Sequence, residues 1–380
     1  MTASREDVRL VLKQLDAWAA EGARRLVCGG EPVALSELHI ELTHRCDLKC
    51  VMCHHWEMPT RLPDSVSREL RVDDFRRLAR SPRLRGVRTV AVTGGEPLLR
   101  PEAVEIVAIL RAAFPDASLG ILSNLWNPGS LRRRLGELRE RGVADFWLGS
   151  SLDGLGDDHD RVRGQPGAFR GLEASLDMLK KEFPQTRVSV NFTILPDNAD
   201  RLWEVYRYAR DRELGFGAQF VVNHEGFEAP RRFSWSEERL DAAAAQIDLV
   251  IEDLCRRHSA LERLVARPPE QSRWLWSQLL YWSRLREHGR ARGPFFDDCM
   301  AGRRWAMISA EGDVFFCPNN KHKVVGNVRE RDFDAVWDGP QAERRRAETL
   351  PCECRGWLNC IAYPVVDRVL AAALPAGAAA

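Results

Sequence analysis

Short apolar runs alternate with charged, helix-like stretches between residue 38 and about residue 225. Runs rich in β-branched residues predict strands, at Leu38–Leu42, Thr89–Val92, Leu119–Leu122, Phe146–Leu152, Val188–Ile194 and Ala218–Val222. Amphipathic spacing predicts helices between them, including Arg71–Leu84, Pro101–Ala113, Ser130–Arg141 and Gly167–Glu182. Six β–α repeats predict an α/β fold with a parallel sheet and outer helices, as a partial barrel or an open doubly wound sheet. Ligands of such sheets bind at the C-terminal ends of the strands.

The segments outside these repeats have a different pattern. Near the N-terminus, apolar residues recur at helical spacing, at Val8, Val11, Leu12, Leu15, Trp18 and Ala19. Residues 227–296 carry several tryptophans and predict two further helices, near Ser236–His258 and Glu270–His288. The chain ends in the low-complexity sequence AAALPAGAAA, which we expect to be frayed.

These patterns divide the chain into five regions. They are an N-terminal helix (1–36), a core of β–α repeats (37–226), a helical linker (227–296), a cysteine-rich C-terminal module (297–365) and a low-complexity tail (366–380). A length of 380 residues agrees with one catalytic domain and a smaller appendage.

Composition narrows the class of protein. The chain is 44% hydrophobic and 29% charged, as in ordinary soluble globular proteins. Its formal charge of +1 gives no general attraction to nucleic acid or membrane surfaces. The start, MTASREDVRL, lacks the apolar stretch of a signal peptide, and no apolar run is long enough to span a bilayer. We therefore expect a cytoplasmic protein without nucleic-acid or membrane partners.

The ten cysteines are clustered rather than spread along the chain. Cys46, Cys50 and Cys53 lie close together, and so do Cys352, Cys354 and Cys360. In a reducing compartment, clustered thiols indicate metal ligation rather than disulfides.

The first cluster lies in ELTHRCDLKCVMC, where a predicted strand is followed by C-x3-C-x2-C. Such a loop presents three thiolates to one iron–sulfur cluster and provides no fourth nearby, which leaves one iron open to a substrate-type ligand. A zinc site or a ferredoxin-type cluster is the alternative. Zinc sites more often use paired C-x2-C hooks, and ferredoxin runs have other spacings.

C-x3-C-x2-C directly after a first strand resembles the signature of the radical S-adenosylmethionine (SAM) superfamily. The resemblance implies a partial (β/α)6 TIM-like barrel and a 4Fe–4S cluster whose fourth iron is chelated by SAM. It also implies reductive cleavage of SAM to methionine and a 5′-deoxyadenosyl radical that abstracts a hydrogen atom from the substrate. Met52 departs from the pattern, because an aromatic residue often precedes the last cysteine.

Further segments resemble the SAM-binding elements of this superfamily. Thr93–Pro97 reads TGGEP: alone it predicts a turn, but by resemblance Gly94, Gly95 and Glu96 hold the methionine amino group. Ser123 and Asn124 end the third predicted strand and are further cofactor candidates.

The fourth predicted strand leads into SLDGLGDDHDRVRG. By resemblance, Ser151 contacts the cofactor ribose and Arg163 its carboxylate. Asp153 and His159 are equally well explained as turn and cap residues. Asn191, in the fifth predicted strand, is a cofactor candidate on the same logic.

The C-terminal module contains Cys299, Gly312 and Cys317 in the spacing C-x12-G-x4-C, followed by Cys352, Cys354 and Cys360. This arrangement resembles the SPASM and twitch modules, which hold auxiliary 4Fe–4S clusters. A full SPASM module has seven cysteines, whereas five are present here. We expect one auxiliary cluster, ligated by Cys299, Cys317 and two of the last three cysteines. A structural zinc site is the competing interpretation.

Cys255 lies on an apolar helical stripe with Ile247, Ile251 and Leu254, which favours buried packing. The alternative is a hydrogen-atom donor, as some radical SAM epimerases use a cysteine.

Three functions agree with these features. The first is a radical SAM oxidoreductase that dehydrogenates or epimerises a small metabolite, such as an amino sugar or cyclitol. The second is a maturase that installs a crosslink or thioether in a ribosomal peptide, and the third is a non-catalytic electron carrier. The short segment before the first strand favours a metabolite modestly, and an open cluster argues against a carrier. A flavodoxin or ferredoxin is the expected reducing partner.

Overall fold

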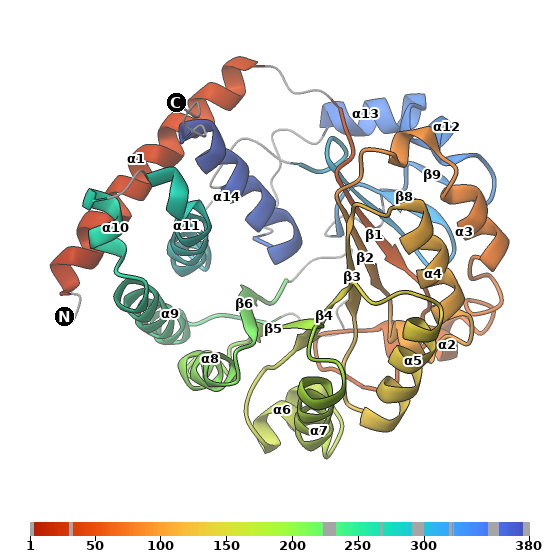
Figure 1. The fold of residues 1–380 in the computed structure, drawn as a ribbon, viewed down its shortest axis with the longest axis horizontal. Coiled ribbons are helices and arrows are strands. Elements are labelled where there is room, and N and C mark those ends of the chain that lie inside the picture. The colour runs from red at the N-terminus through yellow and green to blue at the C-terminus, as the bar shows by residue number, and fades with distance from the viewer. Residues whose placement is uncertain are drawn as a thin grey trace.

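The computed structural model describes residues 4–29, 33–222, 233–266, 269–290, 300–318, 321, 323–348 and 357–374. Its centre is one nine-stranded sheet in the order β6-β5-β4-β3-β2-β1-β7-β8-β9. The first six strands are β1 (Glu37–Glu41), β2 (Thr89–Thr93), β3 (Ser118–Leu122), β4 (Trp147–Ser151), β5 (Arg187–Ile194) and β6 (Gly215–Phe220). Each of these pairs in parallel with the next. The sheet is open, with β6 and β9 at its edges, and the fold is the expected α/β partial barrel (Figure 1).

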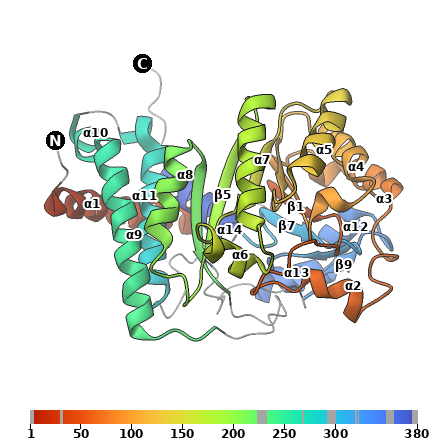
Figure 2. The same ribbon diagram turned by 90° about the horizontal axis from the view of Figure 1, so that it is seen from below.

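The helices that follow the strands cover the outer face of the sheet (Figures 1 and 2). They are α3 (Val72–Leu78), α4 (Ala103–Ala113), α5 (Pro128–Glu140), α6 (Asp157–Arg163), α7 (Ala168–Glu182) and α8 (Leu202–Asp211). Their apolar stripes and the alternate apolar residues of the strands form the core, with Ile40, Val92 and Leu148 fully buried. This layered packing brings the six C-terminal strand ends to one rim.

A second group of helices packs beside β6. It contains α1 (Arg5–Gly29), α9 (Glu237–Arg257), α10 (Ala260–Ala266), α11 (Arg273–His288) and α14 (Asn359–Ala373). α14 packs against α1 and α11, so the two ends of the described chain lie in the same bundle (Figure 1).

The expected tail boundary at residue 366 is wrong. Residues 366–373 continue α14, and Val366, Val369 and Leu370 are fully buried. The run of alanines and leucines is a good helix former with an apolar face, and α1 provides the surface that buries it. Residues 375–380 lie outside the described part of the chain.

The C-terminal module extends the main sheet rather than forming a separate body. β7 (Trp305–Ile308) pairs in parallel with β1, and β8 (Asp313–Phe315) and β9 (Gly326–Asn327) follow in antiparallel order. Gly312 lies in the turn between β7 and β8, with a φ of +99° that favours glycine. Two short helices, α12 (Phe333–Trp337) and α13 (Pro340–Glu348), complete the described part of this module.

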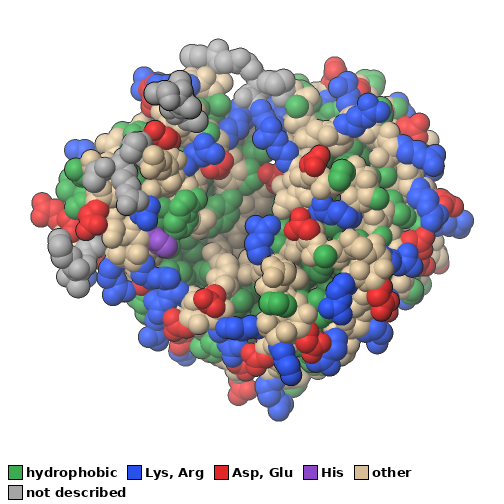
Figure 3. Space-filling view, viewed as in Figure 1, with side chains coloured by type: hydrophobic (Ala, Val, Ile, Leu, Met, Phe, Trp, Pro, Cys, Tyr) green, Lys and Arg blue, Asp and Glu red, His purple; other side chains and the backbone are tan. Residues whose placement is uncertain are grey.

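Both signs of charge are spread over the surface. Figure 3 shows acidic and basic side chains interspersed on one face, which is hollowed near its centre where apolar side chains gather. Among the described helices, none is both long and apolar enough to cross a membrane.

Candidate active site

The three cysteines of C-x3-C-x2-C lie together in the loop after β1. Backbone hydrogen bonds fix this loop to the C-terminal end of α6: Lys49 N–H donates to Arg163 O (3.1 Å) and Val51 N–H to Val162 O (3.0 Å). Burial raises the pKa of the Cys46 thiol to about 12 and also raises that of Cys53. Thiolates at these positions therefore require a neighbouring cation, as a bound metal cluster provides.

The glycines of the TGGEP segment pack directly against the cysteine loop. A Cβ on Gly94 would lie 2.5 Å from Thr43 O, and one on Gly95 would lie 2.2 Å from Arg45 O. Both glycines therefore lie against the backbone just before Cys46. The Gly95 N–H donates a hydrogen bond to Thr43 O at 2.8 Å. By resemblance these glycines hold part of the cofactor, and the structure shows that they also pack closely against this loop.

Glu96 is buried, with 4% of its surface exposed. Its carboxylate accepts hydrogen bonds from the backbone N–H groups of Leu98 (3.1 Å) and Asn124 (2.7 Å). Burial raises its pKa to about 7. The Ser123 side chain is a further hydrogen-bond partner of this carboxylate. A buried carboxylate held by neutral donors is well suited to an ammonium ligand, which would stabilise its charged form.

Ser123 and Asn124 follow β3, and Asn124 supports the cysteine loop. The Asn124 amide donates to Asp47 Oδ1 (2.7 Å), and the Trp126 indole donates to Asp47 Oδ2 (2.9 Å). Ser123 is buried and its hydroxyl accepts the backbone N–H of Leu125 (3.3 Å). Asn124 is therefore occupied in holding Asp47, between Cys46 and Cys50.

Arg163 lies at the end of α6, directly against the cysteine loop. Its guanidinium is 3.5 Å from Cys50 Sγ and forms an ion pair with the buried Asp153. Burial acts to lower the pKa of Arg163, but the Asp153 carboxylate outweighs this effect and raises it. Asp153 N–H donates to His159 Nδ1 (3.2 Å), and burial lowers the pKa of His159 to about 3. The imidazole is therefore neutral and acts as an acceptor.

Two further cofactor candidates lie on neighbouring strands. Ser151, half-buried at the end of β4, is in register with Asn191 of β5. The Asn191 side chain accepts a hydrogen bond from Asn359, the first residue of α14. Asn191 therefore connects the barrel to the C-terminal module in this structure, a role that the sequence did not suggest.

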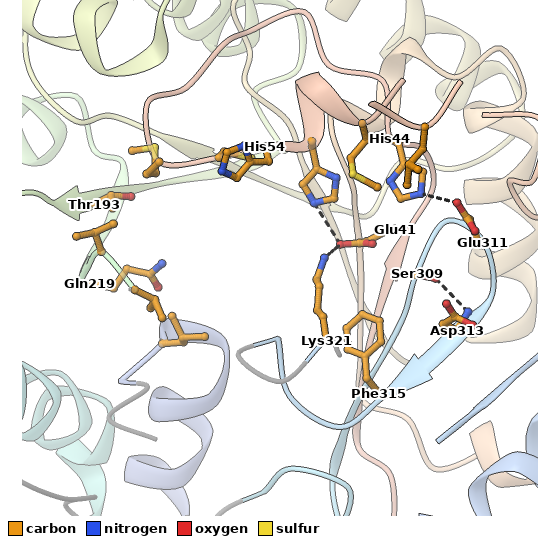
Figure 4. A pocket seen from close by; sticks show the side chains of 18 of the residues that line it. Glu41, His44, His54, Thr193, Gln219, Ser309, Glu311, Asp313, Phe315 and Lys321 are labelled. Atoms are coloured by element: carbon orange, nitrogen blue, oxygen red, sulfur yellow. Dashed lines mark hydrogen bonds and ion pairs between the residues drawn. The ribbon is translucent and has the colours of Figure 1, made fainter. Parts of the chain in front are cut away.

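A cavity of about 460 Å³ opens beside the cysteine loop. Met52, Cys53 and His54 line one part of it, Thr193 of β5 and Gln219 of β6 another, and Leu358, before α14, a third. The remaining wall comes from the end of β1 and from the C-terminal module, with Glu41, Ser309, Glu311 and Lys321 among its residues (Figure 4). The barrel and the C-terminal module therefore both contribute to one open cavity that borders the cluster loop.

The wall formed by β1 and the C-terminal module contains a chain of charged and imidazole groups (Figure 4). The buried Glu41 pairs with Lys321, and His55 Nε2 lies 3.5 Å from its Oε1 atom. Burial alone would raise the pKa of Glu41, but Lys321 and His55 outweigh it and hold the pKa well below its usual range. His44 stacks on His55 with 5.9 Å between ring centroids, and burial lowers its pKa.

The sequence analysis missed Glu41, His44, His55 and Lys321. One signal was available for Glu41: it is a charged residue within a strand whose neighbours are apolar. Nothing near Lys321 indicates a pairing with Glu41, because 280 residues separate them.

Of the five C-terminal cysteines, the structure describes Cys317 and Cys360. Cys317 is buried just after β8, and Cys360 lies in the first turn of α14. Burial raises the pKa of Cys360 to about 12, with the Glu37 carboxylate as a further cause. Glu37 is the first residue of β1. Cys360 therefore lies near the N-terminal end of that strand, whereas the cysteine loop follows its C-terminal end. Cys299, Cys352 and Cys354 lie outside the described residues.

Cys255 is buried in α9, at 3% exposure, and belongs to the apolar core. It is absent from the lining of the cavity. The packing interpretation therefore accounts for it, and the structure does not bring it to the candidate active site.

The open α/β barrel and three-cysteine loop define an iron–sulfur enzyme class, and comparisons with known proteins agree. Residues 40–209 match the family model for the radical SAM superfamily, and residues 299–361 match SPASM, an iron–sulfur cluster-binding domain. The chain belongs to the radical SAM superfamily and carries a C-terminal SPASM domain.

Relatives of known name extend along most of the chain. The AdoMet-dependent heme synthase of Methanosarcina barkeri is 26% identical over 333 residues, covering 86% of this chain and 88% of that protein. The Fe-coproporphyrin III synthase of the same organism is 23% identical over 305 residues, covering 78% and 72%. Among solved structures, Streptococcus suis SuiB bound to precursor peptide SuiA has a similar fold, with a TM-score of 0.56 at 16% identity over 83% of this chain and 67% of that one.

The cofactors of the superfamily are SAM and a 4Fe–4S cluster. The SPASM domain implies auxiliary iron–sulfur clusters. The residues present fit the first site. Three thiols lie together in one loop, and burial raises the pKa of two of them, Cys46 and Cys53, which favours a bound metal. Among the described residues, no cationic side chain hydrogen-bonds to the buried Glu96. Cys46, Cys50 and Cys53 would hold the cluster, and Glu96 the methionine amino group. Arg163 would stabilise the thiolate of Cys50.

Proposed function

We propose that this radical SAM enzyme oxidises a small molecule bound in the cavity beside Cys53. The observation that carries the proposal is the cavity itself, since it borders the cluster loop and has walls from both modules. Its volume, about 460 Å³, falls in the range of small-molecule sites. When bound, the cluster and SAM supply a 5′-deoxyadenosyl radical for hydrogen abstraction. The chain's own residues hold the substrate and exclude water.

Net oxidation is favoured over epimerisation by the lining of the cavity. Epimerisation returns a hydrogen atom to the substrate, for which a thiol or phenol is the usual protein donor. Among the described lining residues, the only thiol or phenol is Cys53, which belongs to the cluster loop. In a net oxidation the substrate instead loses one electron and one proton after hydrogen abstraction, and the auxiliary cluster is the proposed electron acceptor.

An iron tetrapyrrole is the substrate class that we propose. The two relatives reported above are named as synthases of heme and of Fe-coproporphyrin III, and both cover more than two thirds of this chain. A ribosomal peptide is the second candidate, and the amino sugar or cyclitol expected from the sequence has no further support.

The test is turnover by anaerobically reconstituted protein with SAM and a strong reductant. Fe-coproporphyrin III should be converted to a product of different mass, with 5′-deoxyadenosine formed in proportion, and Cys50→Ala should abolish both. Mass spectrometry and chromatography measure the two products. If 5′-deoxyadenosine forms but the tetrapyrrole is unchanged, the substrate class is wrong. If the Cys50→Ala protein still cleaves SAM, the cluster assignment itself is wrong.

A further inference from the structure

Two hydrogen-bond donors face the cavity from opposite sides. Gln219 comes from β6, and Lys321 comes from the segment after Cys317 in the SPASM domain (Figure 4). We propose that each of them binds a carboxylate group of the substrate. This inference rests on the proposed function, because it assigns a part of the same substrate to a part of the same cavity.

The orientation of the Gln219 amide follows from its contact with α14. The backbone N–H of Asn359 donates to Gln219 Oε1 at 3.3 Å. The carbonyl oxygen therefore points toward α14, and the NH2 group is the other end of the amide plane. The hydrogen bonds of the described residues give this NH2 group no acceptor. It presents two N–H donors from a side chain that lines the cavity.

Lys321 is held at the cavity wall by two contacts. Its ammonium pairs with the buried Glu41, and it lies 5.6 Å from the centre of the Phe315 ring. About a quarter of its side chain, 24%, is exposed. An ammonium group has three N–H donors, and a single carboxylate oxygen of Glu41 engages one of them. Lys321 therefore keeps donor capacity for a ligand while Glu41 fixes its position.

The carboxylates on the same wall are already engaged. Glu311 accepts two hydrogen bonds from Arg68, at 3.2 and 3.1 Å. Asp313 Oδ1 accepts from the Asn327 amide at 2.8 Å. The groups of Gln219 and Lys321 that remain available to a ligand are hydrogen-bond donors. They suit an acceptor group such as a carboxylate. Fe-coproporphyrin III, the probe of the proposed function, carries carboxylate side chains that its methyl ester lacks.

The experiment compares binding of Fe-coproporphyrin III and of its tetramethyl ester, by anaerobic absorbance titration of the reconstituted protein. Gln219→Glu keeps an oxygen for Asn359 N–H but replaces the NH2 donors by a negative charge. We expect it to weaken binding of the free acid by about tenfold or more, without changing binding of the ester. Gln185→Glu, at an exposed position in a different groove, is the matched control.

Lys321 is tested in the same way. Lys321→Met alone would leave Glu41 buried without its partner, so the double variant Lys321→Met with Glu41→Gln is used, and Lys323→Met is the control. The double variant should also weaken binding of the acid selectively, with unchanged iron content. If the acid and the ester bind equally well to every variant, the carboxylate site is wrong while the tetrapyrrole proposal stands. If the unmodified protein binds neither compound, both proposals fail.

Discussion

The guanidinium of Arg163 lies 3.5 Å from the sulfur of Cys50, although 113 residues separate the two in the chain. The same guanidinium pairs with the buried Asp153, and the carbonyl of Arg163 accepts the N–H of Lys49. The family resemblance implied a contact between Arg163 and the SAM carboxylate. In the structure, Arg163 contacts the loop that carries the cluster ligands, and its contact with SAM stays a prediction.

Replacing Arg163 should therefore affect the cluster before it affects SAM binding. Arg163→Met leaves the Asp153 charge unpaired in a buried site, which costs roughly 3–5 kcal/mol of unfolding free energy. It also removes the cation beside Cys50, so the cluster should be lost more readily. Urea unfolding and iron content measure the two effects. The control Arg163→Met with Asp153→Asn should recover stability but not iron retention; recovery of both would contradict the role at Cys50.

Glu96 should make SAM binding depend on pH. Its pKa is raised to about 7 by burial, so the carboxyl is largely neutral below this pH and attracts an ammonium group less. SAM affinity should rise between pH 6 and pH 8, as measured by anaerobic calorimetry. Glu96→Gln should bind SAM about tenfold more weakly and lose this rise. A variant with the same pH profile as the unmodified protein would exclude Glu96 as the ammonium acceptor.

The number of C-terminal cysteines limits the iron content. Five thiols allow one four-thiolate cluster but not two, so the reconstituted protein should hold about eight irons. Cys46→Ala with Cys50→Ala and Cys53→Ala should keep about half of them. Iron and zinc are measured together by atomic emission. Zinc in place of the remaining iron would show a structural site instead of an auxiliary cluster.

Cys255 should not act as a hydrogen donor. It is buried in α9 and does not line the cavity. In deuterated solvent, Cys255→Ala should give the same product and the same deuterium content as the unmodified protein. Loss of solvent deuterium from the product of the variant would restore the donor hypothesis.

His39 should weaken the fold in mild acid. Burial lowers its pKa from 6.5 to about 4, so between these values the unfolded state binds a proton that the native state excludes. The unfolding free energy therefore falls as the pH falls through this window, by about 1.4 kcal/mol at pH 5.5. In His39→Leu this part of the pH dependence should disappear from urea unfolding measured between pH 5.5 and 7.5. If the unfolding free energy of His39→Leu changes with pH as steeply as that of the unmodified protein, His39 is solvated.

The sequence predicted the parts of this protein that depend on local patterns. The six parallel strands and most of the helices agree with the apolar periodicity, and the cysteine loop was predicted from its spacing. The contacts of Asp47 with Asn124 and Trp126 were not predicted, because each joins residues that are distant in the chain and have ordinary neighbours. The pairing of Glu41 with Lys321 was missed for the same reason. The low-complexity C-terminus was misjudged, since its burial depends on α1 rather than on its own composition.

The pairing of β7 with β1 has a consequence for how the chain acquires its structure. The Ser36 hydroxyl, at the start of β1, bonds to Arg304 O, 268 residues later. At usual translation rates, the ribosome needs roughly 15–50 s to make that intervening length. Until then, one edge of β1 presents unpaired backbone groups beside apolar side chains, which is a template for aggregation. Expression of residues 1–300 alone should therefore give insoluble protein, and yield of the full chain should rise when chaperones are supplied.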